Sequence, residues 1–442
     1  MASATKYNTY PKYKPSGIDW LGDIPEGWEV KKLKYTVKEL VGGGTPDTGN
    51  DQNWTDGERG TPWVNIADMT NTFIIQETEK KVTPEGLMEK NLRILPKKTL
   101  LYSMYASLGK VALLDIEAVT NQAILGVVED KHKAISDFIK WWLISIEPHL
   151  SFFSSSSTQN NLNEFKVKNM PVFLPSLLQQ RAIADFLDRE TENIEDVIEK
   201  KQKLIELLLE KRQALIAHAV IKGLDPKAKM KPSGIDWLGD IPEGWEVKRL
   251  RFVSNYVKTG STLDSEKQEY FEFGNIPWFT PGDFSEKIDL NDTMRKITPK
   301  AVIDGEARLF KKDSILLVGI GATLGKIGFS KTEFSANQQI NVIYINNQNV
   351  PRFYAYYLMA IAEIVTSTSN ASTLGILNQE KTKQILCVVP SKQEQIKIVD
   401  YIDKQWVTFE NVIKKVESQI EKLQEFRQAL ISNVITGKVK VN

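Results

Sequence analysis

A perfect internal repeat constrains this chain more than any other feature. Residues 14–31 read KPSGIDWLGDIPEGWEVK, and residues 231–248 repeat all 18 positions without a change. Chance does not produce such a match, and self-similarity at a fixed offset is the signature of a duplicated structural unit. The offset is 217 residues here and stays between 214 and 217 along both halves. The chain of 442 residues is therefore one unit, written twice.

Further matched pairs follow in unbroken order along the two halves. They are Pro62-Trp63 with Pro277-Trp278, Leu108-Gly109-Lys110 with Leu324-Gly325-Lys326, Asn121-Gln122 with Asn337-Gln338, Leu162-Asn163 with Leu377-Asn378, and Arg212-Gln213-Ala214-Leu215-Ile216 with Arg427-Gln428-Ala429-Leu430-Ile431. The halves differ most in their middle parts and least at their two ends. This pattern predicts two different heads on one pseudo-symmetric frame.

Each unit has three parts with different character. The opening segment is rich in Gly, Pro and Trp, which favours turns and short extended pieces that form a small packed cap. The middle parts, residues 37–173 and 253–389, mix short β-branched runs with turn residues. Each also carries one aromatic-rich helical stretch, residues 135–150 and 351–366. The middle part is therefore predicted to be an α+β globular domain that occurs twice.

The third part of each unit is a long helix with a coiled-coil seam. The interface positions alternate in steps of four and three. They are Ile194, Ile198, Lys201, Ile205, Leu208, Arg212, Leu215 and Ala219 in the first copy, and Phe409, Ile413, Val416, Ile420, Leu423, Arg427, Leu430 and Val434 in the second. Gly223 and Gly437 follow as C-terminal stops. Each helix could pack on its own domain alone, but two matched helices pair more simply with each other, and the return helix must then run antiparallel.

These parts divide the chain into four segments. They are residues 1–175 for the first cap and domain, 176–228 for the central spacer helix, 229–390 for the second cap and domain, and 391–442 for the C-terminal spacer helix and tail. Because both caps and both helix ends match, the frame should close on itself. The tail, residues 438–442, is therefore expected beside the N-terminal segment 7–14.

Composition restricts the function classes. Only Cys387 and the histidines His132, His149 and His218 are present, which excludes internal disulfides and an ordinary Cys/His zinc site. Lys and Arg total 57 against 56 Asp and Glu, a net charge of +1, whereas nucleic-acid binders usually carry a clear basic excess. Charge alone therefore does not point to DNA, although a neutral total can still contain a basic face.

No membrane segment or export signal is expected. No apolar run approaches the ~18 residues that span a bilayer, and residues 1–10 are polar without the apolar core of a signal peptide. A cytoplasmic protein without membrane contact is the expectation.

The signatures of enzymes that act on DNA are missing. An amino-methyltransferase would show an Asn/Asp-Pro-Pro-aromatic loop and a Gly-rich turn for the methyl donor, and neither occurs. Residues 319–326, GIGATLGK, resemble a phosphate-binding loop, but Ile320 stands where its first Gly belongs and Ile327 where Ser or Thr would hold magnesium. Catalysis is therefore expected on other subunits.

Several of these segments resemble the motifs of one family. The segment Gly17–Trp28, GIDWLGDIPEGW, resembles the opening of the target recognition domains in specificity subunits of type I restriction-modification systems. The Gly42-Gly43-Gly44-Thr45-Pro46 turn, the two Leu-Gly-Lys turns, the two Asn-Gln pairs and the Gln-Gln-Arg and Gln-Glu-Gln openings of the long helices are also similar to that family. The likeness extends over nearly the whole chain.

The resemblance implies an architecture and a set of partners. Two tandem, pseudo-symmetric target recognition domains would each read half of a bipartite site on double-stranded DNA, separated by the antiparallel two-helix coiled coil. Two modification subunits would supply adenine methylation and two restriction subunits ATP-driven translocation and cleavage. S-adenosylmethionine, ATP and magnesium are then expected on those partners only, with no cofactor on this chain. One departure is Thr259-Gly260-Ser261-Thr262 in place of the Gly-Gly-Gly-Thr-Pro turn, where loop geometry is expected to differ.

Polar loop residues are the candidates for contact with DNA, because base edges are read by paired donors and acceptors on loops held by a scaffold. The polar runs 154–163 and 366–378 are either such reading loops or flexible linkers. The Asn-Gln pairs either read adenine bidentately or satisfy backbone groups at strand ends. The lysines of the Leu-Gly-Lys turns suit phosphate contact. The candidates are Thr45, Ser107, Lys110, Asn121, Gln122, Ser157, Gln159, Asn160, Asn161, Thr262, Thr323, Lys326, Asn337, Gln338, Ser369, Asn370 and Thr373.

A second class of function stays open at this point. A coiled-coil scaffold or interaction protein that binds no DNA would show the same duplicated frame. Binding to DNA in the presence of random-sequence competitors, with and without a modification subunit, distinguishes the two.

Overall fold

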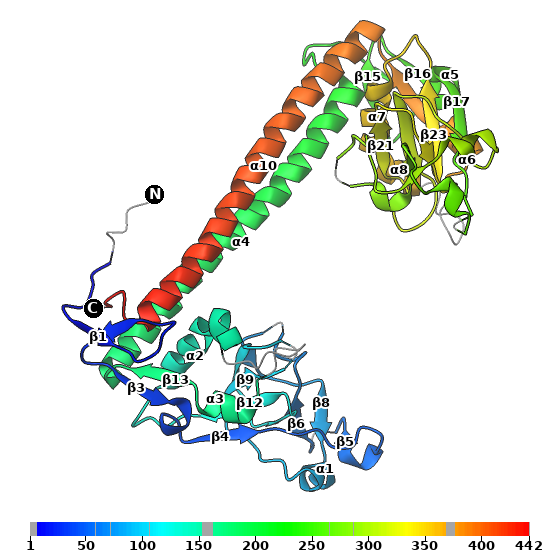
Figure 1. Ribbon diagram of the computed structural model, residues 1–442. Coiled ribbons are helices and arrows are strands. Elements are labelled where there is room, and N and C mark those ends of the chain that lie inside the picture. The colour runs from blue at the N-terminus through cyan, green and yellow to red at the C-terminus, as the bar shows by residue number, and fades with distance from the viewer. Residues whose placement is uncertain are drawn as a thin grey trace. The chain divides into compact units, whose positions relative to one another are not determined.

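The structure, a computed structural model, describes residues 7–57, 59–70, 72–105, 107–152, 162–264, 266–285, 287–367 and 376–441 (Figure 1). The chain forms two compact units. Unit 1 comprises Met1–Lys201 and Ser418–Asn442, and unit 2 comprises Gln202–Glu417. Each unit thus contains one cap, one globular domain and a part of each of the two long helices.

Unit 1 carries a five-stranded sheet in the order β4-β12-β9-β10-β7 and a four-stranded sheet in the order β11-β6-β8-β5. Its elements are β1 (Tyr13–Pro15), β2 (Asp23–Pro25), β3 (Glu29–Lys32), β4 (Glu39–Gly42), β5 (Trp54–Thr55), β6 (Thr61–Val64), β7 (Ile74–Ile75), β8 (Lys80–Val82), α1 (Pro84–Glu89), β9 (Leu100–Ser103), β10 (Val111–Leu114), β11 (Val119–Thr120), β12 (Ile124–Val128), α2 (Ser136–Ser145), α3 (Glu164–Lys168) and β13 (Pro171–Leu174).

Unit 2 repeats this plan with a four-stranded sheet, β17-β23-β20-β21, and a three-stranded sheet, β19-β18-β22. Its elements are β14 (Met230–Pro232), β15 (Asp240–Pro242), β16 (Glu246–Arg249), α5 (Leu250–Val253), β17 (Ser254–Thr259), β18 (Ile276–Phe279), β19 (Lys296–Ile297), α6 (Pro299–Ile303), β20 (Ser314–Val318), β21 (Ile327–Ser330), β22 (Ser335–Ala336), β23 (Ile340–Ile345), α7 (Pro351–Ala360), α8 (Ala362–Ser367), α9 (Gln379–Gln384) and β24 (Leu386–Val389). The predicted α+β domain, present twice, is confirmed.

The aromatic helix of each domain forms its core against the main sheet. Strands β12 and β20 are buried at every position, as expected for apolar strands covered on both faces. In unit 2, α7 packs against β20 and β21, and Tyr354, Tyr356 and Tyr357 are each fully buried. In unit 1, Phe138 and Trp142 of α2 take the same role. Large aromatic rings such as these bury extensive apolar surface and contribute strongly to a core.

The opening segments form small caps of turns and short strands, as the Gly, Pro and Trp content of the repeat predicts, and these caps pack on the ends of the long helices. Trp28 and Trp245 are each 1% exposed. Each indole lies against the glycine that ends a helix: a Cβ on Gly437 would lie 3.3 Å from Trp28, and one on Gly223 would lie 3.3 Å from Trp245. Both glycines have positive φ, +74° and +81°, the left-handed conformation of a C-terminal stop.

The two long helices, α4 (Leu177–Lys222) and α10 (Lys392–Ile435), pack against each other within each unit (Figure 1). In unit 1 the first part of α4 meets the last part of α10, where Lys201 Nζ donates to Gln419 Oε1 at 2.7 Å. In unit 2 the last part of α4 meets the first part of α10, where the guanidinium of Arg212 lies 4.3 Å from the ring centre of Trp406. The helices therefore run antiparallel, as predicted, and packing on separate domains alone is excluded.

Every predicted seam position in the two helices is buried or half-buried. This holds for Ile194, Ile198, Lys201, Ile205, Leu208, Arg212, Leu215, Ala219, Phe409, Ile413, Val416, Ile420, Leu423, Arg427, Leu430 and Val434. Burial is lighter at Ile205, Leu208 and Leu423 than at Ile198 or Ile413.

The described segments nearest the two termini contact each other in unit 1. The backbone N–H of Lys440 donates to Asn8 O at 2.7 Å, and the hydroxyl of Tyr13 donates to Gly437 O at 3.1 Å. The tail thus lies beside the N-terminal segment, as the matched ends of the two copies predict.

Among the described residues, no helix has the combination of length and apolar character that crossing a membrane requires.

Candidate nucleic-acid interface

Three loops meet at one edge of the main sheet in unit 1. Strands β4 and β9 end at this edge and β12 begins there, because β12 pairs antiparallel with both. The loops are residues 43–46, residues 104–110 apart from Ala106, which lies outside the described residues, and residues 121–123. Two backbone hydrogen bonds join them: Gly44 N donates to Thr120 O at 2.8 Å, and Met104 N donates to Ala123 O at 2.7 Å. The sheet thus brings three predicted loop sites together.

The same edge is built in unit 2 with different residues. Strands β17 and β20 end where β23 begins. Ser261 N donates to Ala336 O at 2.8 Å, and Gly319 N donates to Gln339 O at 2.7 Å. These bonds match those of unit 1 position by position. The duplicated backbone therefore presents two sets of side chains from one frame.

The expected difference between the Gly-Gly-Gly-Thr-Pro turn and its counterpart is not found at the point where the loops touch. A Cβ on Gly43 would lie 2.2 Å from Thr120 O, and a Cβ on Gly260 would lie 2.1 Å from the matching Ala336 O. Real Cβ atoms do not approach oxygen so closely. One glycine, retained in both halves, is what the contact requires, so the neighbouring substitutions leave this geometry unchanged.

The two asparagines of the Asn-Gln pairs have a structural role. Asn121 Oδ1 accepts the backbone N–H of Ala123 at 3.0 Å, and Asn337 Oδ1 accepts that of Gln339 at 2.8 Å. This is a local side-chain turn, which favours the interpretation that the asparagines satisfy backbone groups.

The adjacent glutamines are exposed in both units, and so is Thr262 in the first loop of unit 2. In unit 1 the hydroxyl of Thr45 donates to Gln122 Oε1, which brings two candidates from separate loops into contact. Gln338 occupies the matching place in unit 2. Of each pair, the glutamine is therefore the member whose amide faces solvent.

The Leu-Gly-Lys turns place one exposed lysine at each edge. Gly109 and Gly325 have φ of +83° and +86°, which only glycine adopts without strain. Lys110 N donates to the carbonyl of Ser107 at 3.2 Å, and Lys326 N donates to the carbonyl three residues before it, that of Thr323, at 3.1 Å. Ser107 and Thr323 thus hold the turns with their backbone, and they are half-buried.

The polar runs end at this edge as well. Leu162 N donates to Met104 O at 3.2 Å, and Leu377 N donates to Gly319 O at 2.9 Å. The candidates within the runs lie outside the described residues, namely Ser157, Gln159, Asn160, Asn161, Ser369, Asn370 and Thr373.

The last residue of each run begins a helix. Asn163 Oδ1 accepts the backbone N–H of Lys166 at 2.9 Å, and Asn378 Oδ1 accepts that of Lys381 at 2.9 Å. These are N-caps, a structural role for both asparagines.

A pair of arginines was missed by the sequence reasoning. Arg308, exposed on the surface of unit 2, donates to Thr259 O at 2.9 Å beside the first loop. Arg93 stands 215 positions earlier and is ion-paired with Glu39 of β4. The repeat offset itself is the signal that could have found this pair.

Two kinds of reactive group, a thiol and a metal centre, can be checked among the described residues. Cys387 is fully buried, and burial raises the pKa of its thiol, so the reactive thiolate is disfavoured. Within the described ranges, His, Cys, Asp and Glu side chains form no cluster of three or more that could hold a metal ion. Exposed amides, hydroxyls and lysines around one sheet edge are instead suited to hydrogen bonds with base edges and phosphates.

Comparison with known proteins agrees with this arrangement. The profile of the family described as the type I restriction modification DNA specificity domain matches twice, at residues 25–207 and 242–422. The chain is 26% identical over 454 aligned positions to the type I restriction enzyme MjaIX specificity subunit of Methanocaldococcus jannaschii, covering 100% of this chain and 99% of that protein. It is 20% identical to the EcoR124I/EcoR124II specificity subunit of Escherichia coli, covering 74% and 76%.

Solved structures share the fold. A chain from a type I R-M system, studied for complex assembly and conformational transition, superposes with a TM-score of 0.71 at 16% identity, covering 93% of this chain and 98% of that one. The HsdS subunit from Thermoanaerobacter tengcongensis gives 0.56 at 16% identity, covering 94% and 98%. With two family domains spanning most of its length, this chain belongs to the type I restriction-modification DNA specificity family.

Proposed function

We propose that this chain is the DNA-reading subunit of a type I restriction-modification complex, and that each globular domain reads one half of a bipartite site. One observation carries the proposal: the three-loop edge is built twice on matched backbone hydrogen bonds, while residues at these bonds, such as Gly44 and Ser261 or Ala123 and Gln339, differ between the two copies. Equal backbones with unequal side chains are suited to two different half-sites. We refer to the two domains as recognition domains 1 and 2 from here on.

The chain itself is proposed to be non-catalytic. Its site offers hydrogen-bonding and cationic groups, and the thiol of Cys387 is inaccessible. Methylation and cleavage would then be performed by two modification subunits and two restriction subunits bound to this frame. S-adenosylmethionine, ATP and magnesium would be held by those partners. The recurrence of cap and helix in both units supports one modification subunit per repeat.

The test is a methylation assay on the complex of this chain with its modification subunit. Gln122→Ala is expected to relax or weaken recognition of one half-site, and Gln338→Ala that of the other, because a bidentate base contact contributes ~1–3 kcal/mol of discrimination. A library of sites randomised in each half-site reads out both variants. If both changes affected the same half-site, or neither half-site, the assignment of one edge to each half would fail.

The lysines have matched controls on the same strands. Lys110 and Lys326 follow the C-terminal ends of β9 and β20, whereas the exposed Lys97 and Lys312 precede the N-terminal ends of the same strands. Lys110→Ala or Lys326→Ala should weaken binding to all sequences and lower the salt-dependence slope by about 1, since one phosphate contact is lost. Lys97→Ala and Lys312→Ala should leave both the binding and its salt-dependence slope unchanged.

The same assay separates this function from that of a scaffold without DNA contact. A scaffold would assemble with the modification subunit, yet binding to DNA would be insensitive to all of these variants. A gel shift with random-sequence competitor, with and without the modification subunit, gives the corresponding binding measurement.

A further inference from the structure

A buried glutamine and an aspartate eight residues later attach each recognition domain to its long helix. Gln180 and Asp188 lie on α4, and Gln395 and Asp403 lie at the matching places of α10. Both glutamines are only 1% exposed. Each pair lies wholly within one unit and contacts the aromatic helix of the recognition domain in that unit.

The glutamine holds the beginning of the aromatic helix. Gln395 Oε1 accepts the backbone N–H of Val350, the N-cap of α7, at 2.7 Å, and its amide nitrogen donates to the carbonyl of the proline before α10 at 2.9 Å. Gln180 accepts the N–H of Ile135, the N-cap of α2, at 3.1 Å and donates to the matching proline carbonyl at 3.0 Å. A buried N–H left without such a partner costs ~1–3 kcal/mol.

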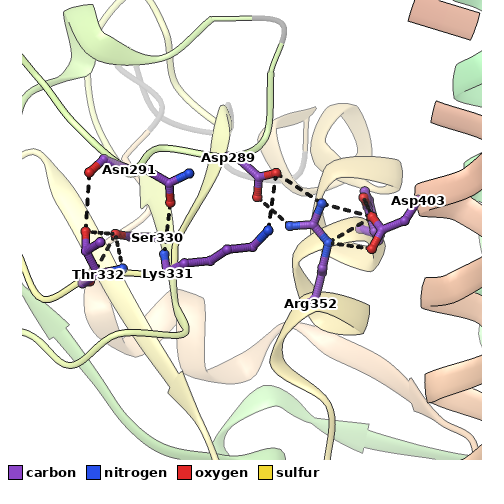
Figure 2. Close-up of polar contacts among 8 residues, drawn as sticks. Asp289, Asn291, Ser330, Lys331, Thr332, Arg352 and Asp403 are labelled. Carbon is purple, nitrogen blue, oxygen red and sulfur yellow. Dashed lines mark hydrogen bonds and ion pairs between the residues drawn. The ribbon is translucent and has the colours of Figure 1, made fainter. Parts of the chain in front are cut away.

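The aspartate holds the side of the aromatic helix at a second point. In unit 2 the guanidinium of Arg352 lies between two carboxylates (Figure 2). Its Nε donates to Asp403 Oδ1 at 2.9 Å, and one of its terminal nitrogens donates to Asp289 Oδ2 at 3.2 Å. The hydroxyl of Tyr356 also donates to Asp403. One arginine on α7 therefore joins the long helix to the segment of recognition domain 2 that contains Asp289.

Unit 1 makes the same attachment with other side chains. Trp141 Nε1 donates to Asp188 Oδ1 at 2.9 Å, and the ammonium of Lys140 bonds to the same oxygen. Lys140 also lies 5.3 Å from the ring centre of Phe73, which is 215 positions before Ile288, the neighbour of Asp289. Lys140 is 11% exposed in its side chain. An aromatic donor, a cation and an aspartate thus recur at one place, although only the aspartate is identical.

Two polar attachment points resist rotation better than one. Apolar side chains of the aromatic helix and the long helix already pack in one core in each unit, and the bond at the N-cap adds one directional contact. The second point lies eight residues further along the long helix, ~12 Å away at ~1.5 Å per residue. Charge-assisted hydrogen bonds to the aspartate are among the stronger polar contacts in proteins. What recurs between the units is thus the geometry of the attachment, with most of its side chains replaced.

We propose that two clasps of positioning residues restrict the range of spacer lengths that the protein accepts between its two half-sites. They are Gln180 with Asp188, Lys140 and Trp141 in unit 1, and Gln395 with Asp403, Arg352 and Tyr356 in unit 2. The proposal rests on the proposed function, because only a reader of two half-sites has a spacer. The clasp residues act on the orientation of each domain and need not touch DNA. Loosening a clasp should broaden the accepted spacers and leave the half-site sequences unchanged.

The experiment uses the complex of the full chain with its modification subunit and a library of sites that differ only in spacer length. Asp403→Asn keeps the size of the side chain and removes its charge. We expect sites with one base pair more or less than the preferred spacer to gain about tenfold in methylation rate relative to the preferred site, which corresponds to the loss of one charge-assisted bond. Asp188→Asn should act alike through the other domain, and the double variant should broaden the range further.

The chain supplies a matched control. Asp185 and Asp400 lie one turn before the clasp aspartates and are exposed, so Asp185→Asn and Asp400→Asn should leave the spacer profile unchanged. Tyr356→Phe removes only the hydroxyl that donates to Asp403, and it replaces Asp403→Asn in the experiment if that variant does not fold. Thermal unfolding of each variant measures the effect on stability separately from that on spacing.

The possible outcomes separate the role of the clasps from the proposed reading of a bipartite site. A native complex that discriminated spacers sharply, with clasp variants of unchanged profile, would overturn the inference and leave the proposed function intact. The inference would also be overturned if the clasp variants were less stable than the native protein but kept its spacer profile. A native complex without any preference for two half-sites would remove the proposed function itself.

Discussion

If the paired helices set the distance between half-sites, lengthening both should lengthen the spacer in the DNA. The insertion consists of seven residues in each helix, which preserves the alternation of four and three along the seam. The structure indicates where the two insertions face each other. Arg212 on α4, between Leu208 and Leu215, stacks on Trp406 of α10. Insertions directly after Arg212 and directly before Trp406 therefore lie opposite one another in the antiparallel pair.

The expected shift follows from helix geometry. Seven residues at ~1.5 Å add about 10 Å, which is roughly three base pairs at ~3.4 Å each. Three base pairs also rotate the far half-site by roughly 100° at ~10.5 base pairs per turn. The lengthened protein should thus prefer a longer spacer with both half-sites unchanged, and it should bind more weakly because protein or DNA must twist to compensate.

Methylation of a library of sites that differ only in spacer length measures the shift. The insertion point leaves the clasp at Asp403 and the bond from Gln213 to Met359 O, 3.3 Å, on the domain side of the cut. A single insertion in α4 alone serves as control, since it breaks the register of the seam and should abolish assembly. Retention of the original spacer at full efficiency by the doubly lengthened protein would show that the helices do not determine the distance.

Other predictions concern the frame. Because the tail bonds to Asn8, joining the termini and reopening the chain between Lys227 and Met230 should preserve methylation of the same site, and failure of this permutant to fold would contradict the closed frame. Gly43→Ala should lower the free energy of unfolding by ~1–3 kcal/mol through overpacking, whereas Gly27→Ala, with open space around its Cβ, should not; denaturant titration compares them. The thiol of Cys387 should react with a thiol reagent only after unfolding, and rapid labelling of the native protein would refute its burial. Light scattering of the complex should give two modification subunits per chain, and a single one at saturation would refute the equivalence of the repeats.

Repetition explains why the architecture could be predicted. Two features can be recognised directly in the sequence: the perfect match of the two caps, and the apolar positions at alternating steps of four and three that begin at Ile194 and at Phe409. Both are patterns of repetition, which a search for periodicity detects. The globular domains and the antiparallel pair followed from those observations. The missed arginine, Arg308, belongs to the same class, because the offset of 215 to Arg93 was present in the sequence.

The contacts between distant segments could not be predicted in the same way. Asp403 meets Tyr356 across 47 positions, and nothing periodic connects them. In unit 1 the partner of the aspartate is a tryptophan, so comparison of the halves hides the match. The three-loop edge shows the opposite case. There a visible change of sequence around Gly260 suggested a changed loop, although the backbone contact depends on that one glycine alone.

The position of the caps has a consequence for chains of half this length. The first cap packs on the end of α10, and the second packs on the matching end of α4. A fragment with one cap, one domain and α4 would leave the end of α4 at Gly223 uncovered, because the cap that packs there belongs to the second half of the chain. A second copy of the fragment could place its cap on that helix end, and the end of its own α4 would receive the cap of the first copy. Such a homodimer would carry the same head twice, and the target it suits is a palindrome.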